Sequence, residues 1–334
     1  MIRLGMIGVG AVVQRHHWPA LQRMPGQIQV IAVASRNPAN ARRFARQSGA
    51  PRVYKDYHQL LEDQDVDAVL TAVPIELNGT VLIDAIRSGK HVLAEKPIAA
   101  TPREARRVLK EHSKQRSVVM VGENFRYRRD LIKARQVIAG GKIGEVSSFQ
   151  VDVKFDLDAK ARRIWISRGW RKNPRHPGGF LLDAGVHPVA ALRDLLGEVS
   201  ELHAYVSDVS SVLKGPDNLL MQLKLTNGVI GHCFFCYTAK QQFESGLDFV
   251  VYGTLGSVRV GNGRVIWSHA VGSRPHLYEI HAFEPGYIDQ LKNFCAAILG
   301  KEDITSTPEK AFGDLLVIDA ALRSAMSGRK VCLR

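Results

Sequence analysis

A lysine at the end of an apolar run is the first residue in the sequence that could handle a proton beside a ligand. Residues 92–94 (Val-Leu-Ala) are typical of a short buried parallel strand, and Glu95-Lys96-Pro97 follows them directly. Ligands of an open parallel sheet bind beyond the carboxyl ends of its strands, so this order predicts that the Lys96 ammonium faces a bound molecule. The alternative is a surface turn with a solvated Glu–Lys pair.

A carboxylate and an imidazole stand four residues apart in the second half of the chain. Asp183 and His187 belong to the run from Gly178 to His187, and on a helix this spacing puts them on one face. Such a pair, with Lys96 opposite, can exchange a proton with a hydroxyl or a carbonyl. Pro188 predicts that a helix starts or kinks here. Taken alone, His187 could equally be a core histidine with satisfied hydrogen bonds.

A glycine pair follows the first expected strand, Ile2–Gly8. Gly8 and Gly10 form a G-x-G-x-x pattern, with Val13 where a third Gly or Ala usually stands. Two glycines allow the backbone to approach a pyrophosphate, which the N-terminus of the following helix then stabilises. Val13 suggests a looser contact between helix and strand than usual. A tight glycine turn without a ligand is the alternative.

The second expected strand, residues 30–34, ends in Ser35-Arg36. A site specific for NAD carries an acid here for the ribose 2′-hydroxyl, whereas a hydroxyl and a guanidinium suit a 2′-phosphate. Charge-assisted hydrogen bonds of this kind contribute about 1.5–3 kcal/mol each, which is enough to set the cofactor preference. We therefore expect NADP, with NAD still open, and the alternative for Arg36 is a solvated arginine.

Histidine and cysteine pairs do not predict a metal site. His16 and His17 have no Cys or third His at ligand spacing, so we expect them to pack on the surface of a helix. Cys233 and Cys236 lie in an apolar run, where strand positions three apart point to opposite faces. We expect both to be buried, reduced thiols.

Length and composition indicate a two-domain soluble protein. The chain has 334 residues, of which 45% are hydrophobic and 23% charged. No apolar stretch approaches the roughly 18 residues that a membrane span requires. The N-terminus enters a strand directly, without the layout of a signal peptide, so we expect a cytoplasmic protein with no membrane partner.

The formal net charge is +14, and the excess is spread over both halves. It could attract nucleic acid, but the sequence carries no nucleic-acid motif, so we expect a phosphorylated cofactor or an anionic small substrate instead. One basic and aromatic segment without acids could clamp a carboxylate or phosphate, the alternative being a surface loop. The segment contains Lys160, Arg162, Arg163, Trp165, Arg168, Trp170, Arg171, Lys172 and Arg175.

Strands and helices alternate as far as Gly122, which predicts a doubly wound parallel sheet in residues 1–122. Residues 123–334 predict an α+β domain with a large, mostly antiparallel sheet, in which Asn227-Gly228 forms a hairpin turn. We expect its strands at Glu201–Val209, Leu219–Thr226, Val229–Tyr237, Leu247–Tyr252, Gly256–Val260 and Val265–Ser268, after one running from Val146 to Phe155, and its helices at Pro188–Leu196, Tyr287–Leu299 and Glu309–Met326.

The order of these motifs resembles the glucose–fructose oxidoreductase, inositol dehydrogenase and MocA (Gfo/Idh/MocA) family over essentially the whole chain. The resemblance is carried by Gly8-Val9-Gly10, by Pro74 with its following helix, by the run from Gly89 to Pro97 and by the run from Gly178 to His187. It implies an N-terminal Rossmann domain, a lysine at the nicotinamide and substrate, and a cis peptide bond before Pro97. Asn78, or a neighbour, stands where many members have a histidine.

The resemblance also implies polar residues at the crossover between the domains, where Asn124 and Arg126 would face cofactor and substrate. Trp170-Arg171 resembles a Trp-Arg pair found in relatives. For Arg128 and Arg129 we expect a solvated helix face instead. The antiparallel sheet in relatives often forms an oligomer interface, so we expect a homodimer or homotetramer.

The implied activity is hydride transfer between nicotinamide C4 and a carbinol or carbonyl carbon of a sugar, sugar derivative or polyol. The alternatives are a reductase of an imine, diol or tetrapyrrole on the same fold, and a non-catalytic NADP-sensing regulator. His187 would exchange the proton, Lys96 would stabilise charge on the reacting oxygen, and Asp183 would orient the site. The expected cofactor contacts are Gly8, Gly10, Ala11, Val12, Ser35, Arg36, Ala72, Pro74, Asn78, Glu95, Lys96, Asn124, Trp170 and Arg171, and the expected substrate contacts are Lys96, Arg126, Trp170, Asp183 and His187.

Overall fold

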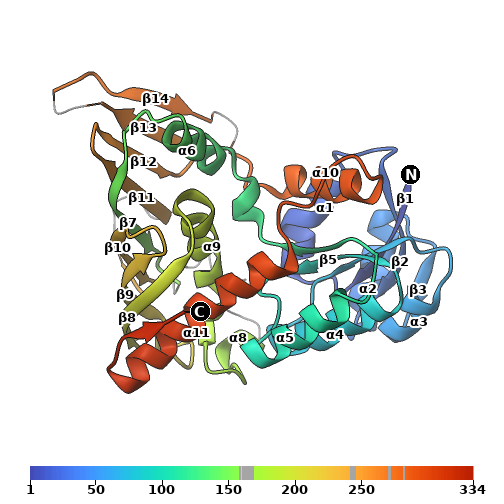
Figure 1. Cartoon of the computed structure of the whole chain (residues 1–334). Helices are drawn as coiled ribbons and strands as arrows, with labels where there is room; N and C mark the ends of the chain where they lie inside the picture. Colours follow the sequence, from blue (N-terminus) through green and yellow to red (C-terminus); the bar gives the residue numbers. More distant parts are fainter. Residues whose placement is uncertain (158, 160–168, 241–245, 270–271, 281–282, 334) are drawn as a thin grey trace. The chain divides into compact units, whose positions relative to one another are not determined.

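The chain divides into two compact units in its computed structural model, which describes all residues except 158, 160–168, 241–245, 270–271, 281–282 and 334 (Figure 1). The first unit contains Met1–Asn124 and Tyr287–Gly313, and the second contains Phe125–Gly286 and Asp314–Arg334. We expected everything after residue 122 in the second domain. Packing places Tyr287–Gly313 in the first unit instead, where the Val121 amide donates to the Ser306 carbonyl at 3.1 Å.

A six-stranded sheet with all strands parallel forms the centre of the first unit, as predicted. Its strand order, β3-β2-β1-β4-β5-β6, reverses direction between β1 and β4, and ligands of open parallel sheets bind at such a point. The strands are β1 (Ile2–Ile7), β2 (Ile28–Ala34), β3 (Arg52–Tyr54), β4 (Ala68–Thr71), β5 (His91–Glu95) and β6 (Val119–Gly122).

Local hydrogen bonds fix where the helices of this unit begin. Asn37 caps one helix by accepting from the amides of Ala39 and Asn40, and Thr101 caps another by accepting from the Glu104 amide at 3.3 Å. The Glu104 carboxylate returns to the Ala100 amide, which completes a capping box. The helices are the π-helix η1 (Val13–His17), α1 (Trp18–Leu21), α2 (Pro38–Ser48), α3 (Tyr57–Glu62), α4 (Ile75–Arg87), α5 (Pro102–His112) and α10 (Tyr287–Ile298).

The second unit is built on a nine-stranded sheet in the order β14-β13-β12-β11-β7-β10-β9-β8-β15. Only the β7–β10 pair is parallel among the described strands, so the mostly antiparallel sheet is confirmed. The strands are β7 (Val146–Lys154), β8 (Val199–Ser207), β9 (Asn218–Leu225), β10 (Ile230–Cys236), β11 (Gly246–Gly253), β12 (Ser257–Gly261), β13 (Arg264–Ser268), β14 (His276–Glu279) and β15 (Val331–Cys332).

Helices cover one face of this sheet, with α6 beside β12 and β13 and α9 beside β7 and β9 (Figure 1). Strand β9 shows the alternation that follows: Leu219, Met221 and Leu223 are buried, whereas Leu220 and Gln222 point outward. The 3₁₀ helix and α-helices of this part are η2 (Asn124–Tyr127), α6 (Arg129–Ala139), α8 (Gly169–Lys172), α9 (Gly179–Leu196) and α11 (Pro308–Ser327).

Helix α9 begins nine residues earlier than expected. We expected the helix to start at Pro188, but the observed helix starts at Gly179 and carries Pro188 in its interior. A proline there removes one backbone hydrogen bond at a cost of about 3 kcal/mol. The helix is buried on most sides, including Leu182, Val186 and Val189, and this apolar burial outweighs the local cost.

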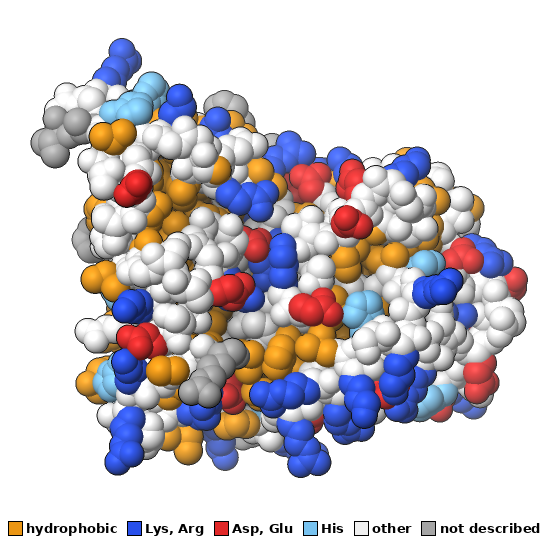
Figure 2. All heavy atoms as spheres, viewed as in Figure 1, with side chains coloured by type: hydrophobic (Ala, Val, Ile, Leu, Met, Phe, Trp, Pro, Cys, Tyr) orange, Lys and Arg blue, Asp and Glu red, His pale blue; other side chains and the backbone are white. Residues whose placement is uncertain are grey.

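Basic side chains are distributed over the surface. Figure 2 shows Lys and Arg side chains on the visible faces of both units with Asp and Glu among them, which agrees with the charge spread in the sequence. None of the helices formed by the described residues combines the length and the apolar composition needed to cross a membrane.

A buried ion-pair network joins three elements of the second unit and includes Arg126. The Arg126 guanidinium, with 1% of its side chain exposed, pairs with Asp194 of α9 and, at 2.6 Å, with Asp314 of α11. Arg193 pairs with the other oxygen of Asp314 and, at 2.8 Å, with Glu198. The structure therefore favours an internal structural role for Arg126 in place of the expected substrate contact.

We expect Arg126→Ala to lower the free energy of unfolding by about 3–5 kcal/mol, because it leaves the buried carboxylate of Asp314 with one partner fewer. Urea denaturation followed by circular dichroism measures the change. Arg259→Ala is the matched control: it breaks the exposed pair with Asp248 and should cost less than about 1 kcal/mol. Equal losses for the two variants would contradict a structural role for Arg126.

Candidate active site

Lys96 lies directly after β5, half-buried at the carboxyl edge of the six-stranded sheet. The Lys96–Pro97 peptide bond is cis, as the family resemblance implied. The glycine turn follows β1, Ser35 follows β2 and Pro74 follows β4. Because parallel strands all end at the same edge, these four expected contacts belong to one edge of the sheet, on both sides of the point where the strand order reverses.

Asn78 of α4 holds the backbone on both sides of Lys96. Its side chain is buried, and its amide nitrogen donates to the Glu95 carbonyl at 2.6 Å and to the Pro97 carbonyl at 2.7 Å. We expected Asn78 to contact the cofactor. In the structure both of its N–H groups are instead used to fix the turn, so Asn78 positions Lys96.

Glu95 and His17 form a second buried contact at this turn. His17 Nε2 lies 2.6 Å from Glu95 Oε1, with 1% and 8% of the two side chains exposed. The expectation that His17 packs on a helix surface was wrong: the helix turns this side chain into the interior of the unit, against β5 and the Tyr287 ring. His16 is half-buried and stacks on the same ring at 4.7 Å.

The glycine turn has the space that a dinucleotide pyrophosphate requires. Gly8 has φ of +87°, and a Cβ there would lie 2.3 Å from the Ala72 carbonyl oxygen, so only glycine fits between β1 and β4. Gly10 has no heavy atom within 4 Å of the corresponding Cβ position, which leaves its backbone open to a ligand. Ala11 and Val12 begin the helix that follows, so the expected residues fit the cofactor.

The helix after the glycine turn widens into a π-helix at Val13–His17. This agrees with the looser contact that Val13 suggested, although Val13 itself is fully buried. At the neighbouring strand end, Ser35 Oγ accepts weakly from the Asn37 amide at 3.4 Å, and Arg36 is exposed. The strand end therefore presents a hydroxyl and an exposed guanidinium.

Asp183 lies on α9 and is paired with a cation. Arg171 Nε donates to Asp183 Oδ2 at 2.5 Å, and the Arg171 guanidinium lies 4.2 Å from the centre of the Trp170 ring. Asp183 is buried, so the ion pair keeps its carboxylate compensated. The structure thus brings together three residues that the sequence predicted separately for cofactor and substrate.

Tyr237 is a neighbour of Asp183 that the sequence did not reveal. Its side chain is fully buried, and this burial, with a smaller contribution from the Asp183 carboxylate, raises the pKa of its phenol. The phenol therefore stays protonated and places no second negative charge beside Asp183. The apolar run from Gly231 to Tyr237 predicted only a strand, so the sequence held no signal for this contact.

His187 is half-buried and lies flat against Phe125, with ring centres 4.8 Å apart and planes inclined by 20°. The Arg128 guanidinium lies 4.6 Å from the same Phe125 ring and pairs with Asp130 at 2.5 Å. The expected solvated face was therefore wrong for Arg128, which is buried, whereas Arg129 is exposed. Asp130, two residues after Arg128, was the available signal for an internal pair.

The remaining expected residues are distributed as follows. Asn124 is buried at the start of η2, and Lys172 and Arg175 are exposed. Five members of the basic segment lie outside the described residues: Lys160, Arg162, Arg163, Trp165 and Arg168.

Two strand cysteines differ in burial. Cys233 is a fully buried free thiol, and burial raises its pKa, which makes a thiolate unfavourable. Cys236 is only half-buried, in contrast to the expectation, because it points to the other face of β10. In the part of the chain that the structure describes, no group of three or more His, Cys, Asp or Glu side chains could hold a metal ion.

Comparisons with known proteins agree with this architecture. Residues 2–123 match the model of the oxidoreductase family with an NAD-binding Rossmann fold, and residues 135–333 match the model of its C-terminal alpha/beta domain. A crystal structure of an oxidoreductase from Thermotoga maritima is 32% identical, covers 99% of this chain and 98% of its own, and superposes with a TM-score of 0.89.

Two further relatives carry assigned activities. The 1,5-anhydro-D-fructose reductase of Ensifer adhaerens is 28% identical over 98% of both chains. A levoglucosan dehydrogenase in complex with NADH and levoglucosan has a TM-score of 0.88 over 99% of both chains, at 22% identity. At that identity the second likeness shows the fold alone. Because the family models match both parts of the chain, this protein is an oxidoreductase of the Gfo/Idh/MocA family.

Proposed function

We propose that this oxidoreductase uses NADP to transfer a hydride between nicotinamide C4 and the carbinol or carbonyl carbon of a sugar, sugar derivative or polyol. The observation that carries the proposal is the fixed position of Lys96, whose flanking carbonyls both accept from buried Asn78 at the ligand edge of the sheet. The substrate class is supported by the sugar-related activity of the Ensifer reductase.

The chain's own residues divide the work of binding. The open backbone at Gly10 and the following helix N-terminus hold the pyrophosphate, and Ser35 with Arg36 holds the ribose 2′-phosphate. When bound, the dinucleotide supplies or accepts the hydride.

The proton and the charge on the reacting oxygen are left to the protein. In the oxidative direction the hydroxyl loses its proton to His187 as the C–H bond breaks, and in the reductive direction His187 returns that proton. The Lys96 ammonium stabilises the negative charge that develops on the oxygen. Asp183, compensated by Arg171 at 2.5 Å, orients these polar groups.

We expect Lys96→Ala to lower turnover by at least about 10²-fold, because the charge on the reacting oxygen loses its stabilising cation. A panel of ketoses, aldoses, keto-sugars and polyols, read by nicotinamide absorbance, measures turnover, and NADPH fluorescence measures a dissociation constant that should stay within about twofold of wild type. Lys110→Ala, at an exposed lysine of α5, is the control. Unchanged turnover in Lys96→Ala would defeat the assignment, and a wild type inactive on every substrate would favour a regulator or a non-sugar reductase.

We expect Arg36→Asp to reduce the preference for NADPH over NADH by about tenfold to a hundredfold, since it removes one charge-assisted hydrogen bond to the 2′-phosphate. The ratio of the two dissociation constants measures the change. Arg46→Asp on α2 alters the net charge equally at an exposed position away from the strand end, and it should leave the ratio unchanged. A constant ratio in Arg36→Asp would exclude Ser35-Arg36 as the phosphate site.

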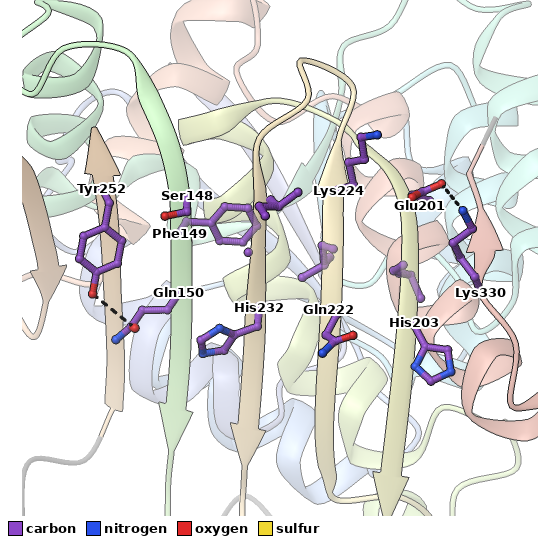
Figure 3. Close-up of a pocket in the computed structure, with 14 residues that line it drawn as sticks. Ser148, Phe149, Gln150, Glu201, His203, Gln222, Lys224, His232, Tyr252 and Lys330 are labelled. Atoms are coloured by element: carbon purple, nitrogen blue, oxygen red, sulfur yellow. Dashed lines mark hydrogen bonds and ion pairs between the residues drawn. The ribbon is translucent and has the colours of Figure 1, made fainter. Parts of the chain in front are cut away.

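We also propose that the protein is a homodimer or homotetramer assembled through the uncovered face of the nine-stranded sheet. Figure 3 shows a depression on this face, where His203, Gln222, His232 and Gln150 form a row across four strands. Exposed apolar side chains accompany this neutral row: Tyr205, Leu220, Ile230 and Tyr252 have 63%, 40%, 57% and 40% of their surface exposed. A second copy of the same face, neutral and partly apolar, is complementary to it.

We expect Ile230→Asp to shift the protein to a smaller species, because two-fold symmetry would bury the new charge twice. Sedimentation velocity or light scattering with size exclusion measures the mass. Leu299→Asp places the same charge at an aliphatic residue of similar exposure, 61%, at the end of α10. A monomeric wild type, or an oligomer that Ile230→Asp leaves intact, would refute the assignment.

A further inference from the structure

We propose that His17 is a positioning residue for Lys96: by its buried hydrogen bond to Glu95 it fixes the strand end from which the ammonium projects. This inference rests on the proposed role of Lys96. No contact between His17 and substrate is required, so its effect is transmitted through one intervening residue.

The contact has the geometry of a fixed pair. His17 Nε2 lies 2.6 Å from Glu95 Oε1, and both side chains are almost completely buried. Removing the imidazole would leave a buried carboxylate without this donor, and such a group moves or draws in water instead of remaining in place. Glu95 is bonded to Lys96 through one peptide, so movement of its side chain reaches the lysine directly.

Two independent features aim His17 at Glu95. The π-helix widens the turn between Val13 and His17, and single π turns of this kind are frequent at functional sites. The Tyr287 ring of α10 then braces both imidazoles, stacking on His16 at 4.7 Å and meeting the edge or face of His17 at 5.1 Å and 86°. The imidazole is therefore held on its own side as well as by Glu95.

The strand end is consequently held at its backbone and at its side chain. Asn78 binds the carbonyls of Glu95 and Pro97, and His17 binds the Glu95 carboxylate. These holds arise from two different helices of the first unit. A displacement of about 1 Å at a reacting group can cost about 10²-fold in rate, so the second hold has a measurable effect.

His17 also belongs to the helix that begins at the glycine turn. The same helix thus carries the N-terminus expected to stabilise the pyrophosphate and, one and a half turns later, the side chain that holds the Lys96 strand end. The first unit therefore connects phosphate binding and lysine placement through a single short helix.

The experiment compares His17→Leu, which removes the donor, with His17→Gln, whose amide can still donate to Glu95. The Lys96 acylation rate, read with an acetylating reagent by peptide mass spectrometry, reports the lysine without any substrate. We expect it to change by at least about threefold in His17→Leu and to return toward wild type in His17→Gln. We expect kcat on the substrate found by the panel to fall about 10–100-fold in His17→Leu, with the NADPH dissociation constant within about twofold of wild type.

His58→Leu is the matched control, because it removes an imidazole–carboxylate pair of the same unit that is 55% exposed on both sides. It should change neither Lys96 acylation nor kcat. If His17→Leu does not fold, His17→Gln and Glu95→Gln decide: wild-type acylation and kcat in Glu95→Gln would overturn the inference. Wild-type values in a folded His17→Leu would do the same.

The two proposals fail in different ways. Full turnover in Lys96→Ala would remove the catalytic assignment, whereas altered Lys96 acylation in His17→Leu would still show that His17 places the lysine. Loss of turnover in Lys96→Ala together with an unchanged lysine in His17→Leu would overturn the inference alone.

Discussion

The hydrogen bonds from Asn78 to the carbonyls on either side of Lys96 are the constraint on which the rest of the candidate site depends. They are short, at 2.6 and 2.7 Å, and they are buried, so water cannot replace them at low cost. A lysine side chain is long and flexible, and its ammonium is well placed only if its backbone is fixed. The parallel sheet supplies the strand end, and Asn78 with the His17–Glu95 pair supplies the precision.

A different solution is used for the groups on α9. Asp183 is held by Arg171, and His187 by the face of Phe125, whose ring is itself covered by Arg128. Charge and aromatic stacking therefore do in the second unit what backbone hydrogen bonds do in the first. In both units the residue expected to act is fixed by neighbours that the family pattern does not single out.

The sequence predicted the architecture well because periodicity and turn residues report burial directly. The parallel sheet, the mostly antiparallel sheet, the glycine turn and Lys96 at the end of β5 all follow from such local patterns. The roles of Asn78 and His17 could not be predicted, because their partners lie 17 and 78 residues away in the sequence. The same holds for Arg126, whose carboxylate partners come 68 and 188 residues later.

The π-helix has a consequence for how this chain can change length. A π turn holds one residue more than the α turn it replaces, so deleting any residue within Val13–His17 would restore regular winding and rotate everything after it by about 100°. The imidazole of His17 would then leave the interior, and no side-chain substitution nearby would restore it. Loops tolerate insertions and deletions, but this turn, although it touches no strand directly, should retain its residue count wherever the fold keeps an acidic residue at the end of β5.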